Sequence, residues 1–88
     1  MTTRKVTILN RAGIHARPAS MIVQTAELYD SSIWFEKDNA RINAKSIMNV
    51  LTLEAVYKTE LVIGAEGPDE EEAVAELTAL FESKFEEE

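Results

Sequence analysis

The stretch from Gly13 to Ala19 constrains the fold of this chain more than any other part of the sequence. Before it, Lys5-Val6-Thr7-Ile8 alternates polar and apolar residues, which is typical of a half-buried strand. Gly13 permits a tight turn, and Pro18 suits the first turn of a helix. The chain is therefore expected to change from strand to helix here, and His15, its only histidine, lies at the corner.

This corner has the chemistry of an anion site. The start of a helix presents backbone N–H groups without intrahelical partners, together with the positive end of the helix dipole. Arg17 can grip phosphate oxygens in a bidentate manner, and Arg11 adds a second positive charge. An imidazole that titrates near neutral pH can act as a nucleophile, so His15 could itself accept a phosphoryl group. The alternative from residue type alone is a surface or hydrogen-bonding histidine.

Length and composition limit the other possibilities. At 88 residues the chain has room for one domain, residues 1–88, with one modest core. It has no cysteine and one histidine, so neither a disulfide framework nor a metal site is expected. Eleven of its sixteen acidic residues lie in residues 60–88, which disfavours nucleic-acid binding. No apolar segment suggests a signal or a membrane span, so the cytoplasm is the expected location.

Hydrophobic periodicity predicts two longer helices. The first runs from the corner to about Leu28, and the last follows Gly67-Pro68-Asp69, where Asp69 and Glu72 resemble a capping box. Met21 lies off the apolar stripe of the first helix and either covers the edge of the core or contacts a partner. The expected buried stripes are Ala19, Ile22, Val23 and Ala26 in the first helix, and Val74, Leu77, Leu80, Phe81 and Phe85 in the last. The terminal Glu86-Glu87-Glu88 is predicted to be a solvated tail.

Between these helices the pattern predicts strands and one short helix. Residues 33–37 and 40–43 form a hairpin around Asp38-Asn39, a pair that tolerates left-handed backbone angles. Ser46 is placed as the N-cap of a short helix, and residues 60–65 form the fourth strand. The order strand, helix, strand, strand, helix, strand, helix indicates an α+β layered fold.

Two motifs resemble the HPr family, the histidine-containing phosphocarrier of the bacterial phosphoenolpyruvate-dependent sugar phosphotransferase system. Gly13-Ile14-His15-Ala16-Arg17-Pro18-Ala19 is similar to the active-site signature of that family, and Lys45-Ser46-Ile47-Met48 to its regulatory-serine segment. The spacing of the motifs and the chain length also match. The resemblance implies an open-faced β-sandwich, a four-stranded antiparallel sheet covered on one face by three helices (β-α-β-β-α-β-α).

The resemblance also implies a function. His15 would accept the phosphoryl group on Nδ1 from enzyme I, which phosphoenolpyruvate phosphorylates, and pass it to an enzyme IIA domain. The backbone amides of Ala16 and Arg17 would hold the phosphate oxygens, and the Arg17 side chain would neutralise charge during transfer. The protein would then be a carrier within a relay rather than a stand-alone enzyme, without a cofactor, and a monomer.

The second motif implies regulation and docking. Ser46 is read from the sequence as a cap, whereas in the family this serine is phosphorylated by a dedicated kinase, the HPr serine kinase/phosphorylase. The expected partner-binding residues are Ser20, Met21, Ile47, Met48 and Leu51. Two other functions stay open: a regulatory or nitrogen-type paralogue that uses the same His15 chemistry, and an interaction domain in which His15 is incidental.

The sequence departs from the family after the second motif. HPr proteins commonly have glycines near the positions of Asn49, Glu54 and Thr59, whereas this chain has none between Gly13 and Gly64. The end of the short helix and the shape of the 54–59 connection are therefore not predicted from the family pattern.

Overall fold

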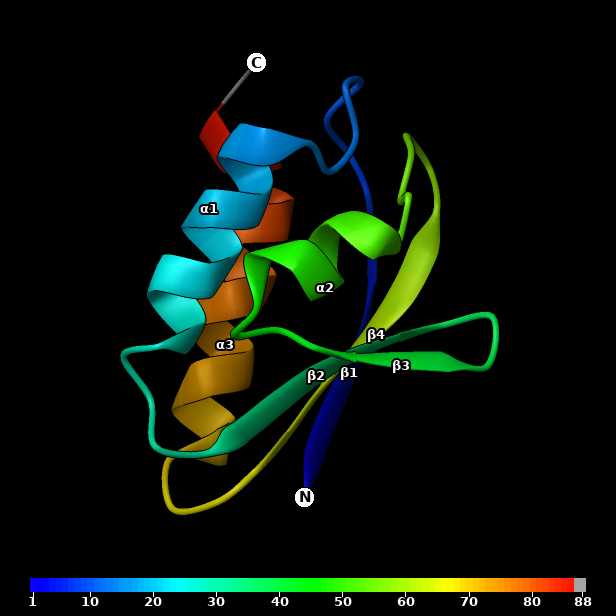
Figure 1. Ribbon diagram of the computed structural model, residues 1–88. Helices are drawn as coiled ribbons and strands as arrows, with labels where there is room; N and C mark the ends of the chain where they lie inside the picture. The colour runs from blue at the N-terminus through cyan, green and yellow to red at the C-terminus, as the bar shows by residue number, and fades with distance from the viewer. Residues whose placement is uncertain (87–88) are drawn as a thin grey trace.

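The computed structural model of the protein describes residues 1–86, so Glu87 and Glu88 of the expected tail lie outside the described residues. Figure 1 shows three helices packed together against a sheet. The elements follow the predicted order, with one added 3₁₀ turn at the end. They are β1 (Thr2–Thr7), α1 (Ala16–Ala26), β2 (Ser32–Lys37), β3 (Ala40–Asn43), α2 (Ile47–Thr52), β4 (Glu60–Glu66), α3 (Glu70–Glu82) and η1 (Lys84–Glu86).

The four strands form one antiparallel sheet in the order β1-β4-β2-β3. The first and the last strand of the chain are therefore neighbours, with Thr7 opposite Glu60 and Thr2 opposite Ala65. Only β2 and β3 are joined by a hairpin, and the helices cover one face of the sheet (Figure 1). This arrangement confirms the predicted α+β open-faced sandwich.

The core lies between the sheet and the helices, and the predicted apolar stripes face it. All four stripe residues of α1 are buried, as are those of α3 and η1 except Leu80, which is partly buried. The ring of Phe81 packs edge-to-face against both Phe35 and Phe85, at centroid distances of 5.8 and 5.0 Å. These contacts join the sheet to the last helix.

The hairpin turn is confirmed, whereas one helix end differs from the prediction. Asp38 and Asn39 have φ angles of +50° and +69°, the left-handed conformation that a tight hairpin requires. α1 ends at Ala26, and the Leu28 side chain is exposed. The apolar residue at position 28 thus extended the predicted helix beyond its actual end.

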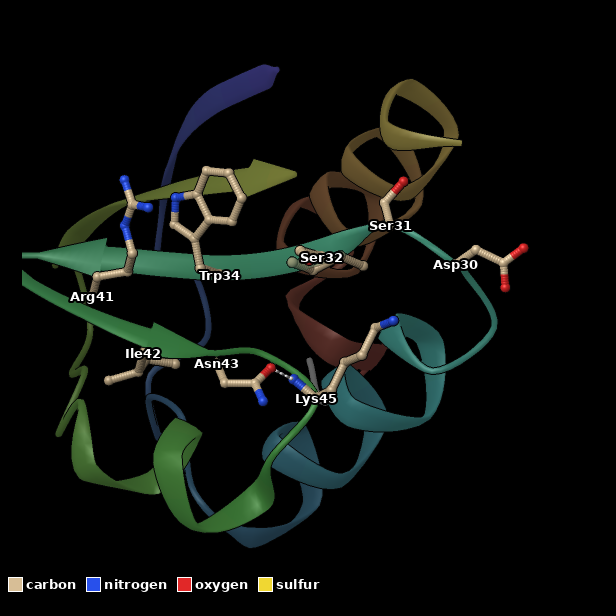
Figure 2. Close-up of a pocket in the computed structure, with 9 residues that line it drawn as sticks. Asp30, Ser31, Ser32, Trp34, Arg41, Ile42, Asn43 and Lys45 are labelled. Atoms are coloured by element: carbon tan, nitrogen blue, oxygen red, sulfur yellow. Dashed lines mark hydrogen bonds between the residues drawn. The ribbon is translucent and has the colours of Figure 1, made fainter. Parts of the chain in front are cut away.

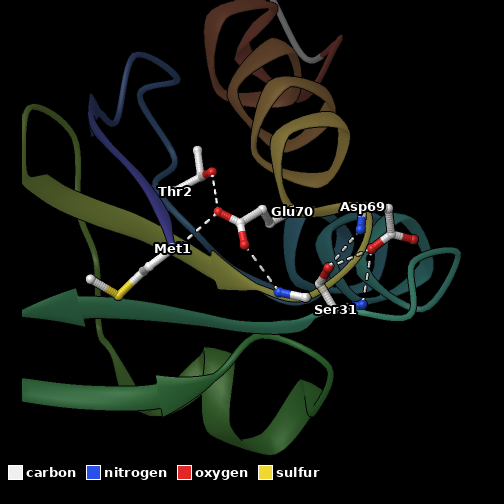
Figure 3. A network of polar contacts seen from close by, with 6 residues as sticks. Met1, Thr2, Ser31, Asp69 and Glu70 are labelled. Carbon is white, nitrogen blue, oxygen red and sulfur yellow. Dashed lines mark hydrogen bonds and ion pairs between the residues drawn. The ribbon is translucent and has the colours of Figure 1, made fainter.

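The predicted capping box at α3 is wrong. Asp69 is the N-cap residue, but its side chain makes no capping hydrogen bond. Its carboxylate instead accepts the N–H groups of Asp30 and Ser31, at 2.9 and 3.0 Å, and the Ser31 hydroxyl at 2.5 Å (Figure 3). These bonds, with that of the Ser31 hydroxyl first, lower the pKa of Asp69 and tie the α1–β2 loop to α3.

Glu70 makes the adjoining contacts shown in Figure 3. Its carboxylate accepts the Thr2 hydroxyl at 2.5 Å and the Gly67 N–H at 3.2 Å, and it pairs with the Met1 amine at 3.0 Å. The Thr2 hydroxyl is the largest of the causes that lower the Glu70 pKa from 4.5 to about 2. The start of β1 is thereby anchored to the first turn of α3.

The connection between α2 and β4 adopts backbone angles for which a glycine would be expected. Glu54 has a φ of +50° and Lys58 a φ of +71°. Both angles lie in the left-handed region, where a side chain costs about 1–2 kcal/mol. The missing glycines therefore leave the turn geometry in place and add strain at two residues.

Candidate functional site

His15 stands where the chain enters α1. It is the N-cap residue, with extended backbone angles (φ −118°, ψ −163°), and its carbonyl oxygen accepts the Ala19 N–H at 2.9 Å. Its side chain makes no capping hydrogen bond, and the residue is exposed. The backbone of His15 thus starts the helix while its imidazole lies at the surface.

The first turn of α1 offers two backbone donors beside His15. The N–H groups of Ala16 and Arg17 precede the first intrahelical hydrogen bond, and Pro18 has no N–H. Within residues 1–86, neither N–H makes a backbone hydrogen bond outside the helix. Pro18 is buried, whereas His15, Ala16 and Arg17 are all exposed at the start of α1. This arrangement suits a multiply charged oxyanion held by the histidine.

The residues before His15 are locked against the α2–β4 connection. Gly13 has a φ of +73°, its N–H donates to the Asn10 carbonyl at 3.1 Å, and its own carbonyl accepts the Asn10 side-chain amide at 2.7 Å. The next N–H, of Ile14, donates to the Ala55 carbonyl at 2.9 Å, and the Ile14 side chain is buried. Ala55 is a positioning residue that sequence reasoning missed, because no local pattern relates it to Gly13.

Ser46 is the N-cap of α2, as predicted. Its Oγ accepts the backbone N–H of Asn49 at 3.2 Å. It also accepts the Asn49 side-chain amide at 3.0 Å, a contact that was not predicted. Both bonds use the hydroxyl oxygen as acceptor, which leaves its own hydrogen available for donation.

The predicted docking residues come from two neighbouring helices. α1 and α2 pack against each other, and they lie side by side in Figure 1. Ile47, Met48 and Leu51 on α2 are 43%, 72% and 36% exposed. On α1, Ser20 is half-buried, and Met21 is partly buried and packs against the core. The core-edge alternative for Met21 is therefore observed, while the partner-binding role of all five residues stays a prediction.

Neither a metal cluster nor a membrane-spanning helix occurs in the part of the chain that the structure describes. Within residues 1–86, no three His, Cys, Asp or Glu side chains gather closely enough to hold a metal ion. None of the helices in the same range has the length and apolar character needed to cross a membrane.

Comparison with known proteins identifies a family that the chain resembles over nearly its whole length. Residues 2–83 match the family model described as the PTS HPr component phosphorylation site. The phosphocarrier protein HPr of Treponema pallidum is 50% identical over 88 residues, which cover all of both chains.

Solved structures are similar as well. The crystal structure of HPr from Thermoanaerobacter tengcongensis superposes with a TM-score of 0.96 at 49% identity, covering 100% of this chain and 99% of that one. The Bacillus subtilis catabolite repression protein Crh, described as a dimer with a swapped domain, superposes with a TM-score of 0.77 at 38% identity. That match covers 96% of this chain and 97% of the Crh chain.

Proposed function

The chain belongs to the HPr family of the phosphotransferase system, and on this premise we propose that it carries phosphoryl groups on His15. A ring nitrogen of His15 attacks the phosphorus atom on phosphorylated enzyme I. The bond between phosphorus and enzyme I breaks as the new N–P bond forms, and the same exchange passes the group to an enzyme IIA domain. No cofactor takes part in either exchange.

The observation that carries this proposal is that exposed His15 lies directly before two N–H groups of α1 that, within residues 1–86, make no backbone hydrogen bond outside the helix. The phosphoryl group on His15 would accept hydrogen bonds from the N–H groups of Ala16 and Arg17. The Arg17 guanidinium would offset the negative charge that develops on the phosphoryl oxygens during transfer. Because the backbone rather than the imidazole caps α1, phosphorylation would cost the helix no capping bond.

Partner binding is assigned to the surface formed by Ser20, Met21, Ile47, Met48 and Leu51. The exposed apolar side chains of α2 support this assignment, since contiguous apolar residues on a small protein mark contact sites. Ser46 lies directly before this surface and is proposed as the regulatory site of a serine kinase. A phosphate there would place charge at the edge of the contact. The relay would operate in the cytoplasm.

Intact-mass measurement tests the transfer step. The purified protein is incubated with phosphoenolpyruvate and enzyme I, and its mass is determined before and after brief acid treatment. We expect one acid-labile phosphoryl group on the wild type and none on His15→Ala. A Ser46→Ala variant serves as the control and should be modified like the wild type. Equal modification of His15→Ala, or no adduct with an enzyme I shown to be active, would contradict the proposal.

The similarity to Crh, a catabolite repression protein, favours a regulatory role as the second candidate. In this candidate, as in the first, His15 of this chain would carry the phosphoryl group. The two are distinguished by offering the phosphorylated protein to enzyme IIA domains of sugar permeases and of regulatory systems. Rapid transfer to an IIA domain of a sugar permease would favour the first candidate, a role in sugar uptake. Transfer only to an IIA domain of a regulatory system would favour the second candidate. The protein is proposed to act as a monomer, which light scattering at working concentration would check against the dimer described for Crh.

A further inference from the structure

A hollow of about 450 Å³ lies at the edge of the sheet where β3 ends, and it is separate from the His15 corner. β3 stops at Asn43, and Ser32, the first residue of β2, is exposed and has no partner on β3. α1 separates the hollow from His15, and its 11 residues span about 16 Å. Figure 2 shows Arg41 and Trp34 side by side at one end, with Lys45 reaching towards the segment of Asp30 at the other.

One wall of the hollow is rigid. A Cβ atom on Gly64 would overlap Cε2 of Trp34, so the indole lies directly on the glycine backbone. The Arg41 guanidinium lies over the ring, with Cζ 4.5 Å from its centroid, and the Trp34 N–H donates to Glu36 at 3.3 Å. The ring is only 9% exposed. Arg41 is thereby held over the ring while its side chain remains 58% exposed.

The second cation has unused donors. Lys45 Nζ donates to the Tyr29 carbonyl at 2.7 Å, and an ammonium group has three N–H bonds to give. Within residues 1–86, no carboxylate lies within ion-pair distance of this nitrogen. Arg41 has a carboxylate nearby, but the Glu36 oxygen is 3.6 Å from its nitrogen, longer than a hydrogen bond. Both cations can therefore take an additional anion.

The remaining polar lining residues can bind hydroxyl groups. Asn43 contributes an amide, Ser32 a hydroxyl and Asp30 a carboxylate. Glu36 lies beside Arg41, so Lys45 is the cation of the hollow that has no carboxylate within ion-pair distance among residues 1–86. A cation for phosphate, together with amide, hydroxyl and carboxylate groups for ring hydroxyls, matches a phosphorylated sugar.

We propose that this hollow binds a phosphorylated sugar, with its phosphate at Lys45 and its hydroxyls at Asp30, Ser32 and Asn43. The hollow is open and small, so the sugar phosphate binds weakly and occupies it only at high ligand concentration. It does not depend on transfer at His15, and the two functions can fail separately.

The single tryptophan provides a direct test, because Trp34 forms part of the wall. Glucose 6-phosphate, glucose and inorganic phosphate are titrated separately while Trp34 emission and backbone ¹H–¹⁵N shifts are recorded. We expect a saturable change with glucose 6-phosphate, at least tenfold weaker binding of the other two, and shifts grouped around residues 30–45. The His15→Ala variant should bind glucose 6-phosphate like the wild type.

Two lysine variants separate binding from folding. Lys45→Met is expected to raise the dissociation constant for glucose 6-phosphate about tenfold. Lys37→Met is the matched control, because Lys37 Nζ also donates to a backbone carbonyl, that of Leu53 at 2.9 Å, but does not line the hollow. It should leave the constant unchanged. Circular dichroism establishes that both variants are folded.

Three results would overturn the proposal. The first is the absence of any saturable change with glucose 6-phosphate. The second is binding that persists in Lys45→Met or that shifts residues 15–17 instead of the hollow. The third is equal affinity for inorganic phosphate, which would reduce the hollow to an anion site without sugar recognition.

Discussion

The carbonyl oxygen of Ala55 occupies the place that a side chain on Gly13 would need. A Cβ atom built on Gly13 would lie 2.6 Å from this oxygen and 3.0 Å from Cα of Val56. The same oxygen accepts the N–H of Ile14, the residue before His15. The orientation of the histidine therefore depends on a residue forty positions further along the chain.

The variant Gly13→Ala should disturb both stability and transfer. The left-handed φ costs about 1–2 kcal/mol for alanine, and the contact with backbone atoms adds to it, so we expect a loss of at least about 2 kcal/mol in the free energy of unfolding. Urea denaturation measures this loss. Ala12→Ser, at an exposed neighbour, should stay within about 0.5 kcal/mol of the wild type. A Gly13→Ala protein of unchanged stability would show that the corner can relax.

Arg17→Ala should slow phosphoryl transfer without unfolding the protein. The side chain is exposed and contributes charge rather than packing, so we expect a transfer rate at least about tenfold lower and an unchanged melting temperature. Rapid-quench kinetics from phosphorylated enzyme I measure the rate. Arg4→Ala, which removes an exposed arginine on β1, is the control and should transfer at the wild-type rate. Equal rates for Arg17→Ala and the wild type would refute the role of Arg17.

Ser46→Asp should weaken docking to enzyme I. Aspartate is as good an N-cap as serine, so this variant keeps the cap of α2 and adds charge beside Ile47 and Met48. We expect a several-fold loss of affinity at low salt that shrinks as salt is added. Ser46→Ala removes the cap at a cost of about 1 kcal/mol in stability but should dock normally. Calorimetric titration that finds equal affinities would count against this mechanism.

Glu54→Gly should be more stable than Glu54→Ala, by about 1 kcal/mol. At a φ of +50° only glycine is unstrained, so the usual preference for alanine is reversed. Glu71, exposed within α3, provides the opposite case: there glycine should be less stable than alanine by about 1 kcal/mol. Chemical denaturation of the four variants gives both differences. If the glycine variant were less stable than the alanine variant at both positions, residue 54 would not be held at its left-handed φ angle.

Acid should destabilise the protein through Glu70. Because its pKa falls from 4.5 to about 2 on folding, the ionised carboxylate stabilises the folded state above pH 4.5. That contribution is lost as the pH falls from 4.5 through about 2. Thermal melts across this range should therefore show a smaller drop for Glu70→Gln than for the wild type, whereas Glu71→Gln should follow the wild type. If the melting temperatures of all three proteins fell equally with pH, the Thr2 and Met1 contacts of Glu70 would not be the cause of the acid destabilisation.

Local patterns predicted the elements well but not the contacts between them. The stripes of α1 and α3, the Asp38-Asn39 turn and the Ser46 cap depend on residues within a few positions of one another. The His15 corner was predicted for the same reason. The strand order does not follow from such patterns, because only β2 and β3 are close enough in sequence to pair as a hairpin.

The misread contacts share a physical origin. Asp69 was expected to cap its own helix, yet its carboxylate binds backbone and hydroxyl groups almost forty residues earlier. Ala55 reaches Gly13 over a similar separation. Tertiary hydrogen bonds of this kind compete with local ones, and no spacing in the sequence reveals which of the two prevails.

Because β1 pairs with β4, we expect a newly made chain to complete its fold only after residues 60–65 have been synthesised. His15 is translated early, but the neighbouring Ile14 donates its N–H to Ala55, and β1 pairs with residues 60–65. Contacts so distant in sequence form late, after the local hairpin and helices. A chain still on the ribosome with its second half unmade would therefore contain the histidine but not the site, and only a finished molecule would enter the phosphate relay.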